Sequence, residues 1–99
     1  MNKIHYEERV KTYTNALITY GERNQCIVAI EELSECQKEI CKVLRNNGDM
    51  DHLAEEIAYA TICLEQIRMI FGLNDTVCRK MDEKVARLDE NLRKEAHHG

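Results

Sequence analysis

The chain contains no proline, and three of its four glycines stand at isolated breaks between long uninterrupted stretches. These breaks read GERN (residues 21–24), NNGDMD (46–51) and GLND (72–75). Proline and glycine are the residues that most disfavour helix interiors, so the pattern predicts four helices, over residues 3–20, 24–46, 52–71 and 75–96. No segment alternates apolar and polar residues as a strand would. We therefore expect an all-α protein with a single domain over residues 1–99.

The residues in the breaks also predict how the helices end and begin. Gly48 suits a left-handed residue that closes the second helix, because glycine adopts positive φ without a steric penalty. Asp51 is the expected N-cap of the third helix, since an aspartate side chain accepts hydrogen bonds from the first backbone amides. Asn74 or Asp75 is expected to do the same for the fourth helix.

Charge and hydropathy exclude several classes of function. The formal net charge is −4 and no tract dense in lysine or arginine occurs, whereas a protein that binds a nucleic-acid backbone usually presents a basic patch. No apolar run is long enough to cross a bilayer, and no signal peptide is visible. We expect a cytoplasmic protein that binds neither nucleic acid nor membrane.

The five cysteines are odd in number and lack CxxC spacing. Most of them fall at apolar helical positions, so we interpret them as reduced core residues, with a zinc site as the less favoured alternative.

Apolar residues at three- and four-residue spacing predict the core face of each central helix. In the second helix this stripe consists of Cys26, Ile30, Leu33, Gln37, Ile40 and Leu44. In the third helix it consists of Leu53, Ile57, Ala60, Leu64, Ile67 and Phe71. Glu31, Glu35 and Glu39 are expected on the opposite side of the second helix, whereas Glu56 lies inside the stripe of the third.

A carboxylate on an apolar face is costly unless another group pairs with it. One interpretation of Glu56 is a salt bridge to a lysine or arginine of another helix. The other is a metal site, because Glu32 and Glu35 stand one helical turn apart and Glu56 would complete a set of carboxylate oxygens. Mg²⁺ prefers such oxygen ligands and retains room for water and phosphate.

The two acidic segments, taken in order, resemble the motifs of a known family. EELSE (residues 31–35) matches the pattern EExxE, and EIAY (56–59) follows after 20 intervening residues, where that family has ExxD. These motifs and their surroundings, from Ala16 to Leu92, resemble the MazG-like all-α nucleoside triphosphate pyrophosphohydrolases. Dimeric dUTPases and phosphoribosyl-ATP pyrophosphohydrolases are relatives of that family.

The resemblance implies hydrolysis of a nucleoside triphosphate to the monophosphate and pyrophosphate, with Mg²⁺, or Mn²⁺ as a substitute, held by Glu32, Glu35 and Glu56. It makes Glu31 an accessory ligand or a residue that orients water, so that Glu31 and Glu35 are the candidate catalytic residues. KVAR, from Lys84 to Arg87, resembles a Lys-x-x-Arg that the family places against the phosphates, with a solvated helix face as the alternative.

Tyr59 departs from the pattern, because the family has an aspartate at this place. A tyrosine is normally neutral at pH 7 and is a poor Mg²⁺ ligand beside a carboxylate. Either Glu55, Asp82 or a water substitutes for the missing acid, or the protein is an inactive relative that binds nucleotides or other proteins.

The expected architecture is an antiparallel four-helix MazG-like bundle whose second and third helices form the central hairpin. One copy cannot cover both sides of that hairpin, so we expect homo-oligomerisation to complete the bundle. The resemblance likewise implies a homodimer or homotetramer.

Overall fold

The computed structural model describes residues 3–98, and the side chains of residues 7–97 among them. This part of the chain is all-α, as predicted, and contains no strand. Four helices follow one another: α1 (Lys3–Tyr20), α2 (Glu22–Leu44), α3 (Met50–Ile70) and α4 (Asn74–His98). Each predicted break is present: the first is reduced to Gly21, whereas the second (residues 45–49) and third (71–73) keep their predicted length and begin one or two residues earlier.

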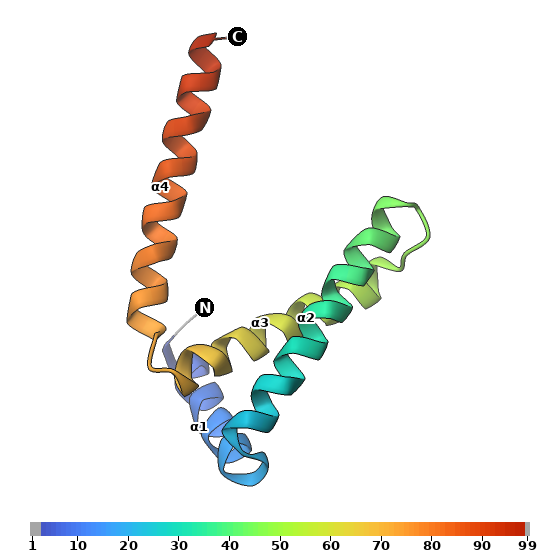
Figure 1. The fold of residues 1–99 in the computed structure, drawn as a ribbon, viewed down its shortest axis with the longest axis vertical. Helices are drawn as coiled ribbons and strands as arrows, with labels where there is room; N and C mark the ends of the chain where they lie inside the picture. Colours follow the sequence, from blue (N-terminus) through green and yellow to red (C-terminus); the bar gives the residue numbers. More distant parts are fainter. Residues whose placement is uncertain (1–2, 99) are drawn as a thin grey trace.

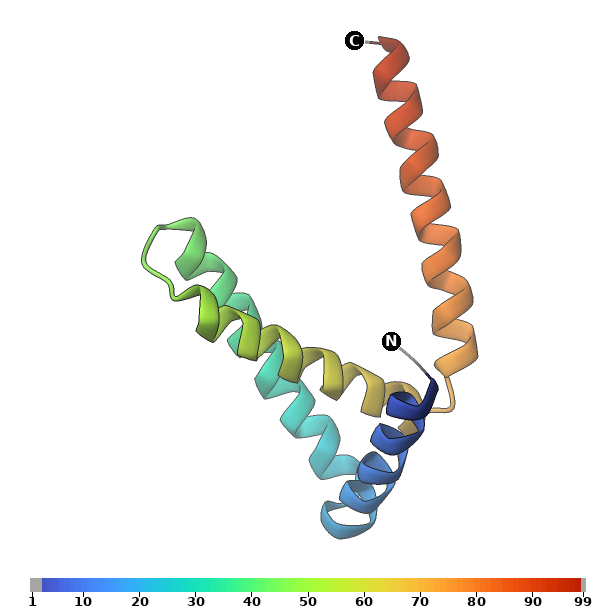
Figure 2. The same ribbon diagram turned by 180° about the vertical axis from the view of Figure 1, so that it is seen from behind.

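Helices α2 and α3 form an antiparallel hairpin, which confirms the prediction of a central pair (Figures 1 and 2). Helix α1 packs across the open end of this hairpin, and α4 leaves from the same end and projects away from it. The described residues therefore extend over 54 × 36 × 25 Å, with a radius of gyration of 16.9 Å. A compact chain of this length would have a radius near ~13 Å, so one copy alone does not close a four-helix bundle.

Asp49, and not Asp51, caps α3. The Asp49 side chain accepts hydrogen bonds from the backbone amides of Asp51, at 2.9 Å, and His52, at 3.4 Å. The prediction of Asp51 was wrong by two positions because two aspartates flank Met50 and both precede the apolar pattern. The prediction for α4 was wrong in a similar way, since the helix already includes Asn74 and Asp75.

Gly48 is needed for a close approach and not for its backbone conformation. The left-handed residue after α2 is Asn46, with φ of 58°, whereas Gly48 is not among the residues with positive φ. A Cβ atom on Gly48 would lie 2.6 Å from Val43 Cγ2 and 2.8 Å from the Val43 backbone nitrogen. The prediction located the break correctly but gave the wrong reason for its glycine.

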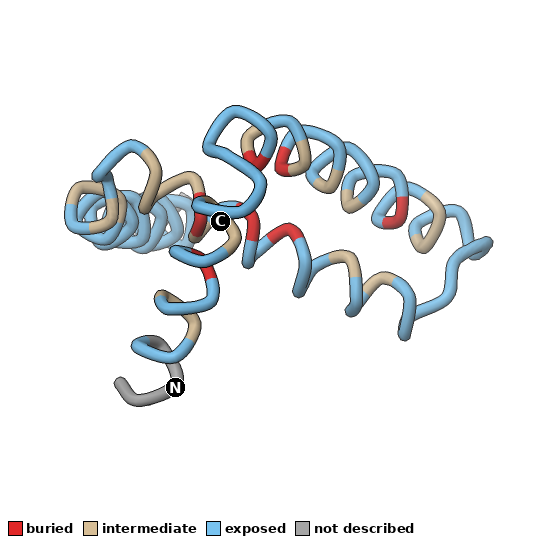
Figure 3. The backbone as a smooth tube through the Cα atoms, turned by 90° about the horizontal axis from the view of Figure 1, so that it is seen from below, coloured by how far each residue is buried: buried red, intermediate tan, exposed pale blue. Residues whose placement is uncertain are grey.

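Small and polar residues, and not the large apolar ones, fill the contact between α2 and α3. Ala29, Ala60 and Cys63 are buried there, together with Gln25, Glu39 and Gln66. Figure 3 shows that the buried residues gather along the first three helices, whereas α4 is half-buried only in its first turn and exposed from Cys78 to His97. Small side chains at a helix contact allow the two axes to approach closely.

The prediction that the apolar stripe of α2 forms the core is therefore wrong for a single chain. Ile30 is 65% exposed and Leu44 is 78% exposed. At about 100° per residue, the stripe points roughly a quarter-turn away from the buried row Gln25, Ala29 and Glu39. Part of the α3 stripe points to the same side. We call this surface the apolar face of the hairpin; it consists of Ile30, Leu33, Ile40, Leu44, Ile57, Leu64 and Phe71, all at least 39% exposed.

A charged cluster fastens α1 to α3. Arg9 Nε and Nη2 each donate to a different oxygen of the Glu65 carboxylate at 3.2 Å, and the Tyr13 hydroxyl donates to Glu65 Oε1 at 2.5 Å. Tyr13 is 5% exposed. Burial raises the pKa of Tyr13 to about 12, and the hydrogen bond to Glu65 and its charge add to the rise. Burial alone would raise the pKa of Glu65, but the hydrogen bonds from Tyr13 and Arg9 outweigh it, and that pKa is lowered.

The cysteines are free thiols, as predicted, but only Cys63 is a fully buried core residue. Cys26 and Cys36 are half-buried, while Cys41 and Cys78 are exposed. Within the described residues, no helix is both long and apolar enough to span a bilayer.

We expect Asp49→Ala to lower the free energy of unfolding by about 1 kcal/mol, because two amides at the start of α3 lose their acceptor. Asp51→Ala is the matched control, and we expect it to cost only about 0.3–0.5 kcal/mol through its weaker interaction with the helix dipole. Urea denaturation measures both. An equal or larger loss for Asp51→Ala would show that the cap is assigned to the wrong residue.

The Tyr13 hydroxyl should make stability fall at alkaline pH. Its folded pKa of about 12 exceeds the unfolded value of 10.0, so its contribution is complete below pH 10 and disappears as the pH rises toward 12. The difference corresponds to about 2–3 kcal/mol. We expect Tyr13→Phe to remove this alkaline loss in denaturation curves between pH 9 and pH 12. Tyr20→Phe, at an exposed position of the same helix, should leave the loss in place.

Candidate metal centre

Glu32 on α2 and Glu56 on α3 meet across the hairpin. Glu32 belongs to the buried row of α2, between Ala29 and Glu39, because the three follow one another at three- and seven-residue intervals. Glu56 stands one turn before Ala60, and its side chain is 16% exposed. The position of Glu56 on the packed face of α3 agrees with the sequence prediction.

The charge of Glu56 acts on the pKa of Glu32. Burial raises the pKa of Glu32 above its ordinary value, and the charge of Glu56 and a hydrogen bond between the two carboxyls raise it further. The charges of Glu35 and Glu31 add to the rise. Two carboxylates can share such a hydrogen bond only when one of them holds a proton. When both glutamates are ionised, the carboxylate oxygens of Glu32 and Glu56 have no proton to share between them.

Glu56 Oε2 is a buried atom with no hydrogen-bond partner among the described residues. The other oxygen, Oε1, lies 4.0 Å from His52 Nε2. A buried carboxylate oxygen without a partner destabilises the fold unless a donor or a cation reaches it. The predicted salt bridge from Glu56 to a lysine or arginine is absent among the described residues. Its neighbour is His52, at the distance limit of an ion pair.

Glu39 is a site residue that the sequence analysis placed on the wrong side of α2. It is 3% exposed, and its Oε1 lies 3.3 Å from Lys42 Nζ and 3.4 Å from His52 Nε2. His52 Nδ1 lies 3.9 Å from Glu55 Oε2. The buried charge of Glu39 is therefore compensated, in contrast to that of Glu56. The spacing of Glu39 from Glu32, two turns along the same row, was the signal that could have found it.

The remaining carboxylates of the predicted set lie at the rim. Glu31 and Glu35 are exposed, and both act on the pKa of Glu32 through their charge. Among the described residues, no three His, Cys, Asp or Glu side chains converge in an arrangement that could hold a metal ion. Glu32 and Glu56 are thus brought together, whereas Glu35 would have to turn its exposed side chain inward. Ordering such a glutamate costs up to about 1.5–2 kcal/mol of rotamer entropy.

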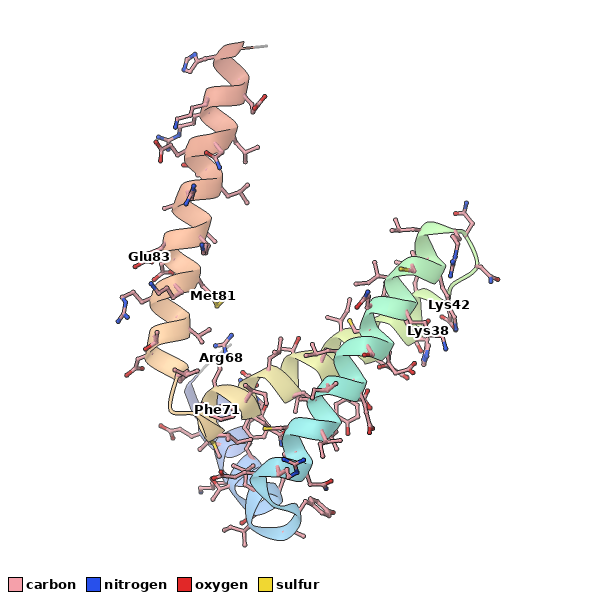
Figure 4. The ribbon with its side chains drawn as sticks, in the orientation of Figure 1. Lys38, Lys42, Arg68, Phe71, Met81 and Glu83 are labelled. Carbon is pink, nitrogen blue, oxygen red and sulfur yellow. The ribbon has the colours of Figure 1, made fainter. Side chains whose placement is uncertain are left out.

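Lys84 and Arg87, the predicted phosphate contacts, are not near this cluster within one chain. Both are exposed on α4, which projects away from the hairpin (Figure 1). Figure 4 shows Lys38 and Lys42 at the loop end of the hairpin, remote from Met81 and Glu83 on α4. The basic side chains that pair with the buried acids are Lys42, with Glu39, and His52, with Glu39 and Glu56; the sequence analysis selected neither.

Tyr59 borders the acidic pair as expected. It is 47% exposed, and burial raises its pKa, with further contributions from the charges of Cys63, Glu32 and Glu56. Its phenol therefore stays neutral at pH 7 and supplies no negative charge. Of the proposed substitutes, Glu55 is near but its side chain is 71% exposed, and Asp82 lies on the remote α4.

No protein-family model, no curated protein and no solved structure matches the chain.

The repulsion between Glu32 and Glu56 predicts that the fold becomes less stable as the pH rises and Glu32 ionises. The folded pKa of Glu32 lies above the unfolded value of 4.5, so its ionisation destabilises the fold at pH 7 and this effect vanishes as the pH falls toward 4.5. We expect Glu32→Gln to raise Tm at pH 8 without divalent cations, and the gain to shrink at pH 5. Glu90→Gln, on the exposed α4, should change Tm little at either pH.

Proposed function

We propose that this protein is a cytoplasmic Mg²⁺-dependent pyrophosphohydrolase that converts a nucleoside triphosphate to the monophosphate and pyrophosphate, acting as a homodimer or homotetramer. The observation that carries the proposal is the unpartnered oxygen of Glu56 beside Glu32. Two carboxyls on facing helices are held at a spacing that raises the pKa of one of them, and no lysine or arginine is recorded within ion-pair distance of either among the described side chains.

The donors at this place suit a hard divalent cation. Carboxylate oxygens are the ligands that Mg²⁺ prefers, and a cation between Glu32 and Glu56 would remove both their repulsion and the unsatisfied oxygen. Glu35 would complete the set by turning inward from the rim. When bound, Mg²⁺ neutralises phosphate charge and lowers the pKa of water, which is the chemistry that phosphoryl transfer requires.

The chain's own residues have distinct roles in this proposal. Water attacks phosphorus, the bond from the α-phosphorus to the bridging oxygen breaks, and pyrophosphate leaves with that oxygen. Glu31, exposed at the rim, would orient the attacking water, together with Glu35. Cys63 lies beneath the pair as a neutral thiol, because burial and then the charge of Glu32 raise its pKa. The resemblance of EELSE and EIAY to the MazG-like motifs supplies the reaction and the substrate class.

A second function is supported by Tyr59. Because its phenol is neutral and stands where the resembling family has an aspartate, the site has one negative charge fewer than that pattern requires. A chain that retains the scaffold but not the chemistry would bind nucleotides or another protein without hydrolysing them. This inactive relative is the alternative to the enzyme.

Pyrophosphate release from a panel of NTPs and dNTPs, with Mg²⁺ or Mn²⁺, separates the two functions. For the enzyme we expect turnover by the wild type and a loss of at least ~100-fold in Glu56→Gln, because one of the carboxylates that hold the cation is removed. Glu83→Gln, an exposed acid on α4, is the matched control and should retain full activity. A folded wild type without turnover, together with turnover by Tyr59→Asp, would establish the inactive relative.

Metal binding has a readout that does not depend on turnover. We expect Mg²⁺ to raise Tm of the wild type, as any ligand of the native state does, and to leave Tm of Glu56→Gln unchanged. The same titration with Glu83→Gln controls for general ionic effects. Equal shifts in all three proteins would show that the carboxylate pair does not hold the cation.

A further inference from the structure

The candidate site does not explain α4. This helix carries a regular stripe of apolar residues that remains exposed. Met81, Val85, Leu88 and Leu92 follow one another at intervals of four, three and four residues and are between 52% and 65% exposed. Such spacing places all four on one side of a helix, in the pattern of a coiled-coil seam. We call α4 the arm and these four residues the arm stripe. All described side chains from Cys78 to His97 are exposed.

The hairpin presents a complementary surface. The α2 part of its apolar face, Ile30, Leu33, Ile40 and Leu44, follows intervals of three, seven and four residues, with Gln37 at the intermediate position. At about 1.5 Å per residue, this row is about 21 Å long, and the arm stripe is about 17 Å long. Two apolar helical rows of similar length and period can interdigitate. By helical periodicity, the apolar face lies about a quarter-turn from the packed row that carries Glu32 and Glu56, so it is a separate surface from the carboxylates.

The arm cannot easily cover the hairpin of its own chain, because the turn before it is fixed. The Leu73 amide donates to Arg68 O at 2.8 Å and the Gly72 amide to Met69 O at 3.3 Å, with Gly72 at φ of 64°. These two bonds form a Schellman motif, which ends α3 with a defined exit direction. The arm begins at once, since the Val77 amide already donates to Leu73 O.

A contact just beyond the turn fixes the start of the arm relative to α3. Arg68 Nη2 lies 3.6 Å from Met81 Sδ, at the first residue of the arm stripe (Figure 4). A hollow of about 190 Å³ at this elbow joins the apolar face to the start of the arm; it is lined by Leu64, Ile67, Arg68, Leu73 and Val77. Apolar side chains thus line the surface continuously from the hairpin, past the turn at Gly72, to the start of the arm.

We propose that the arm docks on the apolar face of a second copy of this chain, whose own arm docks in return. This exchange is isologous, because one self-complementary pair of surfaces occurs twice about a two-fold axis. Asp82 and Asp89 follow one edge of the arm stripe, and Asp89 lies 2.7 Å from Arg93 of the same arm. Arg23 and Arg45 lie toward the outer edge of the α2 row, so the complementary charge at the rim is that of Asp82. The inference does not depend on the proposed catalysis.

The available area suits such an interface. Burial of a large aliphatic side chain, worth about 1.5–3 kcal/mol at ~25 cal/mol per Å², corresponds to about 60–120 Å². The eleven side chains of the arm stripe and the apolar face are about half exposed, so each copy would offer about 300–700 Å² of apolar area. Interfaces are about 57% apolar, which gives about 600–1,200 Å² per copy, against the ~800 Å² typical of a stable complex.

Photo-crosslinking with isotope labels tests the exchange in the full chain. Val85→benzoylphenylalanine chains, one half labelled with nitrogen-15, are unfolded together, refolded, illuminated and analysed by mass spectrometry. We expect mixed-isotope crosslinks from the arm to peptides of α2 or α3. Crosslinks within one isotope only would mean that the arm folds back on its own hairpin, and crosslinks between two arms would mean a different interface. Either result overturns the proposal.

A point substitution provides the second measurement. Leu88→Asp places a charge in the arm stripe, and we expect it to raise the dimer dissociation constant at least ~10-fold in sedimentation experiments at micromolar concentration. Asn91→Asp puts the same charge on the same helix outside the stripe and should change that constant less than ~2-fold. A monomeric wild type, or a Leu88→Asp dimer as stable as the control, would also overturn the proposal.

Discussion

The close contact between α2 and α3 is the interaction on which the rest of the structure depends. Ala29, Ala60 and Cys63 are small enough for the two helices to approach, and the carboxylates of Glu32, Glu39 and Glu56 are carried into the contact with them. Burying acids in this way opposes folding unless each is compensated. Lys42 and His52 compensate Glu39, whereas Glu56 keeps a buried oxygen without a recorded partner. This difference between the paired charge of Glu39 and the unpaired oxygen of Glu56 is what distinguishes a candidate site from an ordinary packed hairpin.

The same contact leaves the large apolar residues outside. Because α2 packs through its small and acidic row, Ile30, Leu33, Ile40 and Leu44 emerge on the flank of the hairpin. The arm adds a second uncovered stripe, while α1 is held to α3 by a buried charged cluster around Glu65. A chain of 99 residues has little core of its own, so a structure with this much exposed apolar surface gains stability by association. The carboxylates lie in the packed row, about a quarter-turn from the apolar face, which allows a cation site and an interface to coexist.

The agreement between sequence and structure was good where a single physical rule decided the outcome. The absence of proline and the positions of the three internal glycines gave four helices, and the place of Glu56 on the packed face of α3 followed from helical periodicity. Predictions failed where two residues could satisfy the same rule. Asp49 and Asp51 both suit an N-cap, and Gly48 was assigned to a left-handed turn although its role is the close approach to Val43. Glu39 was placed opposite the apolar stripe by helical periodicity, and that side of α2 proved to be the buried one.

The sequence by itself determined the helices, their order and the two acidic segments, because helix propensity and breaks act locally along the chain. It indicated the apolar row of α2 as the core face, whereas the row of small residues and acids is the one that is buried. Only the tertiary structure decided this, since the choice depends on how near the helix axes can come and on which surfaces remain to be covered. The tertiary structure likewise brought Glu32 and Glu56 together and kept Lys84 and Arg87 apart from them, because the exit direction of α4 is set at Gly72 by hydrogen bonds that no pattern of residue types specifies.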